Sequence, residues 1–282
     1  MDTYWDRLWE RGYDANMGDG AARAYWSDEE RAAAYDDEVS ANNWERGRRQ
    51  LESLPCCTGA RVLDIGAGPG SLAIPLSSAA SHITAVEPST AMNARTRRHM
   101  DALGITNISV VERAWEDVDV RRDLAPPYDV VVCSFSLGMR AIRAALRAMH
   151  EMACGSVHLF WHIGYRFPER ELEEAFSQLQ VRPFIPFPKA TIVYNILCGM
   201  GIYANVTVTS RTVEQAVPSL RSACDLYATK HHITCPSERQ VLREVLAKAL
   251  EVTRDGGYLL RTTWHSAHLW WEAGNADEKE NR

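Results

Sequence analysis

Short apolar runs alternate with amphipathic stretches through the middle of this chain of 282 residues. Each apolar run is followed by a segment that can form a helix, and continuous apolar runs are typical of parallel strands covered on both faces. The five runs are 61–65, 82–87, 108–112, 128–133 and 156–161. The pattern predicts a doubly wound α/β domain with a mostly parallel sheet.

The segments on either side of these runs follow other patterns. Residues 1–54 are rich in Trp, Tyr and charged residues with amphipathic helical stretches, and they are expected to form a helical lid or cap. Gly12, Gly18 and Gly20 are candidate hinges, with a permanently docked helical pair as the alternative. After the fifth run, four prolines interrupt 165–203, which predicts an insertion that covers the substrate.

Regular structure is expected again beyond this insertion. Residues 203–210 alternate as a strand does, and 240–250 has apolar residues at helical spacing. A final strand at 258–264 follows a Gly-Gly turn. The main domain is therefore expected to span 55–271, and the polar residues 272–282 to form a disordered tail.

The charge balance argues against a nucleic-acid partner. The formal net charge is −6, whereas a phosphate-binding surface needs an excess of clustered cations. The densest basic stretches, 46–49 and 95–99, have acidic neighbours and are interpreted as solvated helix faces.

Cysteine usage and hydropathy exclude further classes. The seven cysteines form no C-x-x-C pair and no zinc-ligand spacing, so reduced thiols and no metal site are expected. No apolar run reaches the length of a membrane span, and the N-terminus lacks the apolar core of a signal peptide. We therefore expect a cytoplasmic protein without a membrane partner, and the sequence leaves its oligomeric state open.

Residues 61–76, RVLDIGAGPGSLAIPL, carry the clearest chemical signal. A strand with Asp64 near its end runs into Gly66, Gly68 and Gly70. Glycine lets the backbone pass close to a ligand. The helix that begins after the glycines turns its free N–H groups toward the carboxyl ends of the strands, where open α/β sheets bind ligands.

Glu87 ends the second strand, about 20 residues beyond the glycines, where a carboxylate can accept two hydrogen bonds from ribose hydroxyls. A dinucleotide-binding fingerprint has the spacing G-x-G-x-x-G/A, but Ser71 stands at its last position. The spacing here is G-x-G-x-G, preceded by the acidic Asp64. With these features, the segment 61–161 resembles the class I S-adenosylmethionine-dependent methyltransferases.

The resemblance implies a seven-stranded Rossmann-like sheet with its last strand antiparallel, and S-adenosyl-L-methionine as cofactor. It implies that the loop 66–70 wraps the methionine part and that Glu87 holds the ribose. Where many members have an adenine-binding carboxylate this chain has Ala114, which leaves that role to the backbone around Trp115 and to Glu116; core packing is an equally good interpretation of Trp115. The cofactor-binding candidates are Asp64, Gly66, Ala67, Gly68, Gly70, Glu87, Pro88, Trp115, Glu116 and Ser134.

The loops after the fourth and fifth strands form the substrate side of this fold. The acceptor-binding candidates there are Phe135, Trp161, Tyr165 and Arg166. His162 could take a proton from an acceptor hydroxyl or thiol, although a lone His after a strand is more often structural. Arg166 or Lys189 could bind a substrate carboxylate or phosphate, but an isolated cation is usually a surface residue. The residues 265–271 are interpreted as an aromatic edge after the last strand, not as a metal cluster.

Three functions compete at this point. The main hypothesis is a methyltransferase that acts on a small-molecule acceptor, with a protein side chain as the less favoured acceptor. A nicotinamide-dependent oxidoreductase is disfavoured by Ser71 and Asp64. A catalytically silent scaffold that keeps the nucleoside pocket is the third, because one fold can serve several functions.

Overall fold

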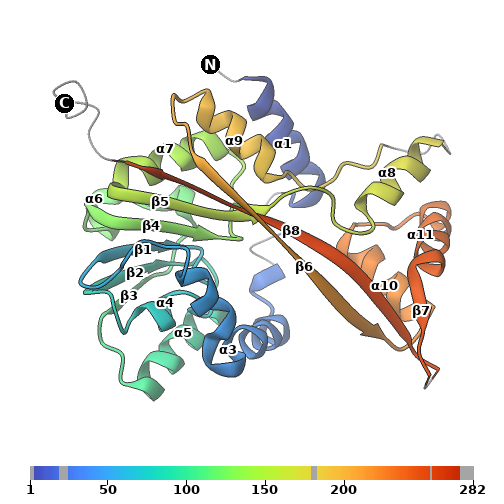
Figure 1. Cartoon of the computed structure of the whole chain (residues 1–282), viewed down its shortest axis with the longest axis horizontal. Helices are drawn as coiled ribbons and strands as arrows, with labels where there is room; N and C mark the ends of the chain where they lie inside the picture. The colour runs from blue at the N-terminus through green and yellow to red at the C-terminus, as the bar shows by residue number, and fades with distance from the viewer. Residues whose placement is uncertain (1–2, 19–24, 179–182, 255, 274–282) are drawn as a thin grey trace.

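The computed structural model describes residues 3–18, 25–178, 183–254 and 256–273. One mixed sheet with helices on both faces forms its main part (Figure 1). The predicted hinge Gly20 and the segment 274–282 of the predicted tail lie outside the described residues. Within the described ranges, no helix is long and apolar enough to cross a membrane.

Five parallel strands form the centre of the sheet, where the apolar runs predicted them. They are β1 (Arg61–Ile65), β2 (His82–Val86), β3 (Ile108–Val111), β4 (Tyr128–Ser134) and β5 (Ala153–His162). Their order is β3-β2-β1-β4-β5, so the direction of winding reverses between β1 and β4. Such a switch point opens a crevice beyond the carboxyl ends of the two strands.

Two longer strands complete the sheet. In β6 (Asn205–Val217) and β8 (Tyr258–Glu272) the chain forms an antiparallel ribbon, and β8 also pairs antiparallel with β5. A short eighth strand, β7 (Leu250–Val252), pairs with β8 outside this order. The doubly wound, mostly parallel α/β class is thereby confirmed.

The predicted bounds of these two strands were too short. The ribbon is paired from Asn205 with Trp270 to Val217 with Tyr258, well beyond 203–210 and 258–264. Cross-strand hydrogen bonds also keep 211–217 of β6 and 265–272 of β8 extended, beyond the segments whose pattern predicted a strand. The His- and Trp-rich residues 265–271 therefore lie within β8 and not after it.

Helices cover the two faces of the sheet. On one face α1 (Tyr4–Asn16), α7 (Ile142–Met152) and α9 (Ala190–Cys198) pack together over the larger apolar cluster. On the other face lie α3 (Glu29–Leu51), α4 (Ala73–Leu76) and α5 (Thr90–Leu103). The short α6 (Val120–Asp123) and the 3-10 turn η1 (Trp115–Asp117) belong to the connection between β3 and β4.

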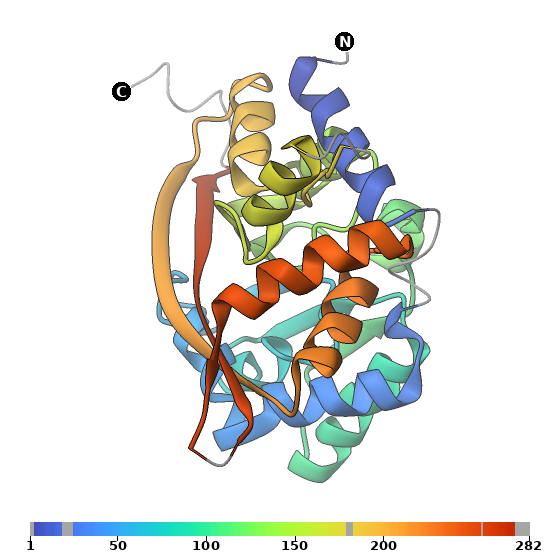
Figure 2. The ribbon, with the colours of Figure 1, turned by 90° about the vertical axis from the view of Figure 1, so that its right-hand side faces the viewer.

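A separate apolar cluster lies at the outer end of the ribbon. There α8 (Glu169–Gln178), α10 (Leu220–Lys230) and α11 (Pro236–Ala249) pack on the distal parts of β6 and β8, and we call this group the ribbon subdomain. Figures 1 and 2 show the ribbon running from the main sheet to these helices. Of the two helices in the predicted insertion 165–203, α8 belongs to the ribbon subdomain, whereas α9 packs with α1 and α7.

The first N-terminal helix, α1, is anchored in the main core. Trp9 is fully buried, and its indole N–H donates to a backbone carbonyl of the loop after β4 at 2.8 Å. Asp6 pairs with Arg143 of α7 at 2.9 Å. The candidate hinge Gly12 lies inside this helix, where an added Cβ would come within 2.7 Å of the Pro188 ring. Gly12 is therefore a close-packing position and not a hinge.

The second N-terminal helix, α3, docks through a buried charge. Asp36 contacts the His99 ring at 2.7 Å, and Arg98 and Arg95 approach the same carboxylate at 3.4 and 3.9 Å. The interpretation of 95–99 as a solvated helix face was wrong for Arg95 and His99, whereas Arg98 is exposed. All three residues surround a carboxylate that lies far away in the sequence, and the charge pattern of one helix cannot reveal such a partner.

Candidate functional site

A cavity of about 380 Å³ lies at the carboxyl ends of β1, β2 and β4, at the switch point of the sheet. Its wall contains the glycine loop, the strand ends that follow it and parts of both N-terminal helices. Nine of the ten predicted cofactor-binding residues line it: Asp64, Gly66, Ala67, Gly68, Glu87, Pro88, Trp115, Glu116 and Ser134. The topology thus brings together residues from four different loops.

The three glycines of the loop all have positive φ angles, but their surroundings differ. At Gly66 an added Cβ would lie 2.2 Å from Cβ of Ser136, so this glycine lets the loop after β4 approach. At Gly70 it would lie 2.6 Å from Ile74, which explains why Gly70 faces α4 and does not line the cavity. At Gly68 the nearest atom is 3.8 Å away in Tyr35, another cavity residue. Gly68 is therefore the point where bare backbone faces the open space.

Glu87 is buried and held by the backbone on both sides. Its Oε2 accepts a hydrogen bond from the amide of Gly68 at 3.0 Å, and its Oε1 accepts one from the amide of Ser89 at 2.8 Å. Burial raises the pKa of this carboxyl, and the two amide donors oppose that rise. The backbone of the protein itself thus fixes the orientation of the Glu87 carboxylate.

Asp64 is 2% exposed, and no described residue donates a hydrogen bond to its Oδ2. Burial, and then the neighbouring Glu87, raise the pKa of Asp64 to about 7, while a hydrogen bond from the amide of Ala73 acts in the opposite direction. A buried carboxylate oxygen without a donor is costly. The side of the cavity next to the glycine loop therefore offers an acceptor for a ligand N–H group or a positive charge.

The adenine-side candidates lie together on one wall. Trp115 and Glu116 line the cavity beside Ala114. Trp115 also belongs to the main core, and its indole N–H donates to the carbonyl of Ala145 at 3.2 Å. Trp115 therefore packs in the core and also borders the cavity.

The N-terminal segment supplies much of the wall, and none of its cavity residues was among the predicted site residues. Tyr13, Met17, Trp26, Tyr35, Val39, Arg46, Gly47 and Gln50 all line the cavity. Gln50 donates to the Ser134 hydroxyl at 3.0 Å, which connects α3 to the end of β4. The interpretation of 46–49 as a solvated face was wrong for Arg46, which lies 5.9 Å from the Phe135 ring. The aromatic content of this segment was its detectable signal; its position over the cavity depends on docking.

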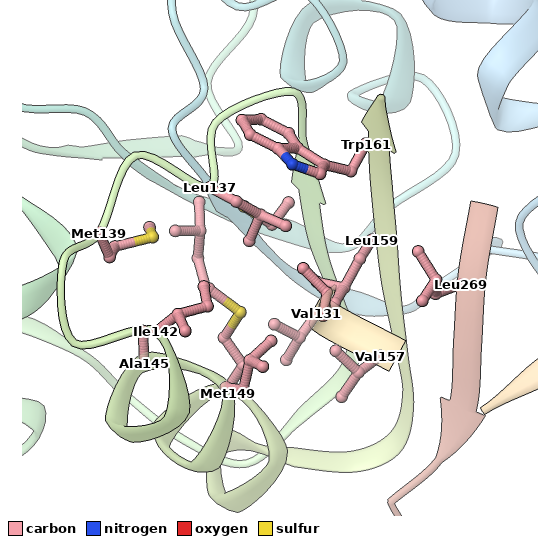
Figure 3. Packing of buried hydrophobic residues seen from close by; sticks show 14 of the residues in the cluster. Val131, Leu137, Met139, Ile142, Ala145, Met149, Val157, Leu159, Trp161 and Leu269 are labelled. Carbon is pink, nitrogen blue, oxygen red and sulfur yellow. The ribbon is translucent and has the colours of Figure 1, made fainter. Parts of the chain in front are cut away.

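Of the acceptor candidates, Phe135 and Trp161 line the cavity. Trp161 donates its indole N–H to the carbonyl of Pro188 at 2.9 Å and lies above the core residues Leu137 and Leu159 (Figure 3). Phe135 has a φ of 54°, a left-handed conformation that is costly for a bulky residue and is concentrated at functional sites. This end of the cavity is aromatic and rigidly supported.

His162, Tyr165 and Arg166 lie outside the cavity lining in the described structure. The His162 ring packs behind Phe135, with 4.9 Å between ring centroids. Burial, and then the charge of Arg166, lower the pKa of His162 to about 3, so the ring is neutral near pH 7. Tyr165 is 46% exposed and bonds to Glu173. The chain turns toward the ribbon subdomain after β5, and this carries the last two residues away from the cavity.

Comparison with known proteins finds a match for the segment that contains most of this site. Residues 62–154, about a third of the chain, match the model of a family described as "Methyltransferase domain". This segment is therefore similar to methyltransferase domains. The matched segment contains the glycine loop, Glu87, Trp115 and the loop after β4, and the resemblance inferred from the first two of these is confirmed.

A curated relative and two solved structures are also similar to this chain. An uncharacterized protein of Haemophilus influenzae is 28% identical over 156 residues, which cover 55% of this chain and 56% of the relative. The YcgJ protein of Bacillus subtilis has a TM-score of 0.56 at 13% identity, covering 82% of this chain and 98% of its own. A putative methyltransferase of Bacillus halodurans has a TM-score of 0.52 at 11% identity, with 80% and 97% covered. At these identities the two structures show the shared fold.

Proposed function

We propose that the protein transfers the methyl group of S-adenosyl-L-methionine to a small-molecule acceptor. The observation that carries this proposal is the pair of buried carboxylates at the glycine loop of a methyltransferase domain. Glu87 is oriented by two amides, and Asp64 has an oxygen without a donor. A ligand with ribose hydroxyls at one end and an ammonium group at the other satisfies both.

The wall residues divide into three roles in this proposal. Glu87 accepts from the ribose hydroxyls, and Asp64 with Gly66 and Gly68 faces the methionine part; the wall at 114–117 holds the adenine, with Ala67, Pro88 and Ser134 completing the cofactor side. The cofactor, when bound, supplies a methyl group on a sulfonium that a nucleophile can displace. Gly70 supports the loop from behind.

The acceptor side contributes alignment and exclusion of water. Phe135 and Trp161 form a rigid aromatic wall that can orient an acceptor, and alignment in a dry site supplies much of the acceleration of a displacement. Enclosure by the N-terminal helices favours a small acceptor over a protein surface. His162 is neutral and can accept a proton, but Phe135 must move, or a water must intervene, before the ring reaches the acceptor.

Part of the N-terminal segment 1–54 acts as a lid in this proposal. The mobile part is assigned to Trp26, which lines the cavity with its ring tilted by 51° to that of Tyr35 at 5.0 Å between ring centroids. The α1 helix is assigned to the permanent scaffold because Trp9 is fully buried in the main core. Closure would complete the cavity wall after the cofactor binds.

Calorimetry with S-adenosylmethionine and S-adenosylhomocysteine tests the proposal. The Glu87→Gln variant should lose about 10- to 100-fold in affinity, the equivalent of about 1.5–3 kcal/mol for hydrogen bonds to a charged group. Glu112→Gln is the matched control, because Glu112 follows the neighbouring strand β3 and does not line the cavity. Heat from a nicotinamide dinucleotide but from neither adenosyl ligand would instead establish the oxidoreductase. Binding without production of S-adenosylhomocysteine from any acceptor would establish the silent scaffold.

A further inference from the structure

Four cationic side chains converge behind the aromatic end of the cavity. They come from four separate segments: Arg46 from α3, Arg166 from the loop after β5, Arg211 from β6 and Lys230 from the end of α10. We call these four residues the cation cluster. Their meeting place lies between the main sheet and the ribbon subdomain, where Figure 1 shows β6 and β8 crossing from one to the other.

The ring of Trp264 organises three members of the cluster. Arg166 lies 4.3 Å, Arg211 5.2 Å and Lys230 6.0 Å from the centroid of this ring. A cation over an aromatic face gains about 0.5–2 kcal/mol, but the gain does not cancel the repulsion among several positive charges. One aromatic residue of β8 therefore holds three like charges close to one another.

Positive charge exceeds negative charge around the cluster in the part of the chain that the structure describes. Glu38 pairs with Arg46 at 3.0 Å. The charge of Glu169 acts on Arg166 and Lys230, but this carboxylate pairs with Lys189 at 2.7 Å. No carboxylate in the described ranges forms an ion pair with Arg166, Arg211 or Lys230, and Nε of Arg166 is buried without a hydrogen-bond partner. Burial, and then the charge of Arg166, lower the pKa of Lys230 to about 8. An anion placed here would relieve this repulsion.

A continuous set of contacts links the cluster to the cavity. Arg46 itself lines the cavity and lies 5.9 Å from the Phe135 ring. The His162 ring also packs on Phe135, with 4.9 Å between ring centroids, and Nη1 of Arg166 lies 3.4 Å from Nε2 of His162. The positive charge therefore stands next to the wall against which the proposed acceptor lies.

We propose that the cation cluster binds an oxyanion, a carboxylate or a phosphate, carried by the methyl acceptor. The apolar part of the acceptor lies against Phe135 and Trp161, and the anionic group reaches toward Arg166 and Lys230. This assignment deepens the proposed function and rests on it. Arg166 provides a planar fork for two oxygens, and Lys230 adds an ammonium from a residue at the exposed end of α10.

Binding of small anions to the protein saturated with S-adenosylhomocysteine tests this inference. The probes are benzoate and inorganic phosphate, with benzamide as the neutral analogue, each measured by calorimetry at constant ionic strength. The variants are Lys230→Met and Arg211→Met, both exposed residues whose replacement leaves the core intact. Lys248→Met and Arg243→Met, on the exposed side of α11, make the same changes of charge away from the cluster.

We expect at least one anion to bind the wild-type protein more tightly than benzamide. Its affinity should fall about tenfold in each cluster variant and stay unchanged in the α11 variants, with the affinity for S-adenosylhomocysteine constant throughout. Equal anion binding in cluster and α11 variants, or none in the wild type, overturns the anion site and leaves the methyltransferase proposal standing. Failure of S-adenosylhomocysteine to bind any variant or the wild type overturns the methyltransferase proposal, and the acceptor assignment with it.

Discussion

The two ends of the cavity draw on very different lengths of chain. The glycine loop, Asp64 and Glu87 belong to a single strand-loop-helix-strand unit, 61–87. The aromatic end combines the loops after β4 and β5 with the N-terminal helices, and the cation cluster behind it adds β6 and α10. The first end is held by hydrogen bonds within one unit, whereas the second exists only when distant segments dock.

This difference separates cofactor binding, which many proteins share, from acceptor binding, which differs between proteins. A cofactor that is the same in many proteins can be bound by a short conserved geometry of backbone amides and carboxylates. An acceptor differs between proteins, and loops and appended segments can change without disturbing the sheet. The ribbon subdomain and α3 are therefore the parts of this molecule in which specificity is to be sought.

The largest expected effect comes from Trp9, which connects α1 to the aromatic end. Trp9→Ala should lower the free energy of unfolding by about 3–5 kcal/mol, because a fully buried large side chain is removed from the core. Trp26→Ala should lower the free energy of unfolding by only about 1 kcal/mol, since this half-buried ring mainly packs against the rings of its aromatic neighbours. Urea unfolding of both variants measures the difference. A small loss for Trp9→Ala would place α1 in the lid as well.

The glycine loop allows a matched test of backbone geometry at the cofactor end. Gly66→Ala should lower the free energy of unfolding by about 2–5 kcal/mol, because about 1–2 arises from the left-handed φ and the rest from collision with Ser136. Gly59→Ala has a similar φ but nothing within 4 Å of the added Cβ, so it should show the first cost alone. Equal losses in urea unfolding would contradict the proposed close approach of the loop after β4.

The smallest expected effects are in the pH dependence of the free energy of unfolding, which distinguishes the two ends of the cavity. Burial raises the pKa of Asp64 from 3.8 to about 7, so the folded protein binds more protons than the unfolded chain and Asp64 destabilises it as pH rises from about 4 to 7. Burial lowers the pKa of His162 from 6.5 to about 3, so His162 destabilises the fold as pH falls through that interval. Each contribution changes by at most about 1.4 kcal/mol per pH unit.

Urea unfolding at pH 5 and pH 7 measures these contributions. Asp64→Asn should gain stability relative to the wild type at pH 7 more than at pH 5. His162→Asn should show the opposite order. Identical pH dependence in the wild type and in either variant would mean that the corresponding side chain is more solvated than its surroundings indicate.

Local sequence determined the central sheet and the cofactor end of the cavity. Continuous apolar runs can be buried on both faces only as parallel strands, so β1 to β5 followed from hydrophobic pattern alone. The loop 66–70 follows β1 and Glu87 follows β2. Because these two strands pair side by side, the loop and Glu87 come together. Asp64, Gly66, Ala67, Gly68 and Glu87 line the cavity for this reason, whereas Trp115, Glu116 and Ser134 come from the segments after β3 and at the end of β4.

Tertiary structure alone decided the acceptor end. Whether Arg46 faces solvent or the cavity depends on how α3 docks, which the buried Asp36 controls from another part of the helix. The cation cluster arises because β6 and β8 pair far beyond their apolar halves and bring Arg211 and Trp264 beside Arg166. Each cation resembles a surface residue in its own segment. The register of the long antiparallel ribbon places these cations together. The sequence of one strand does not reveal which distant strand it pairs with, or in which register.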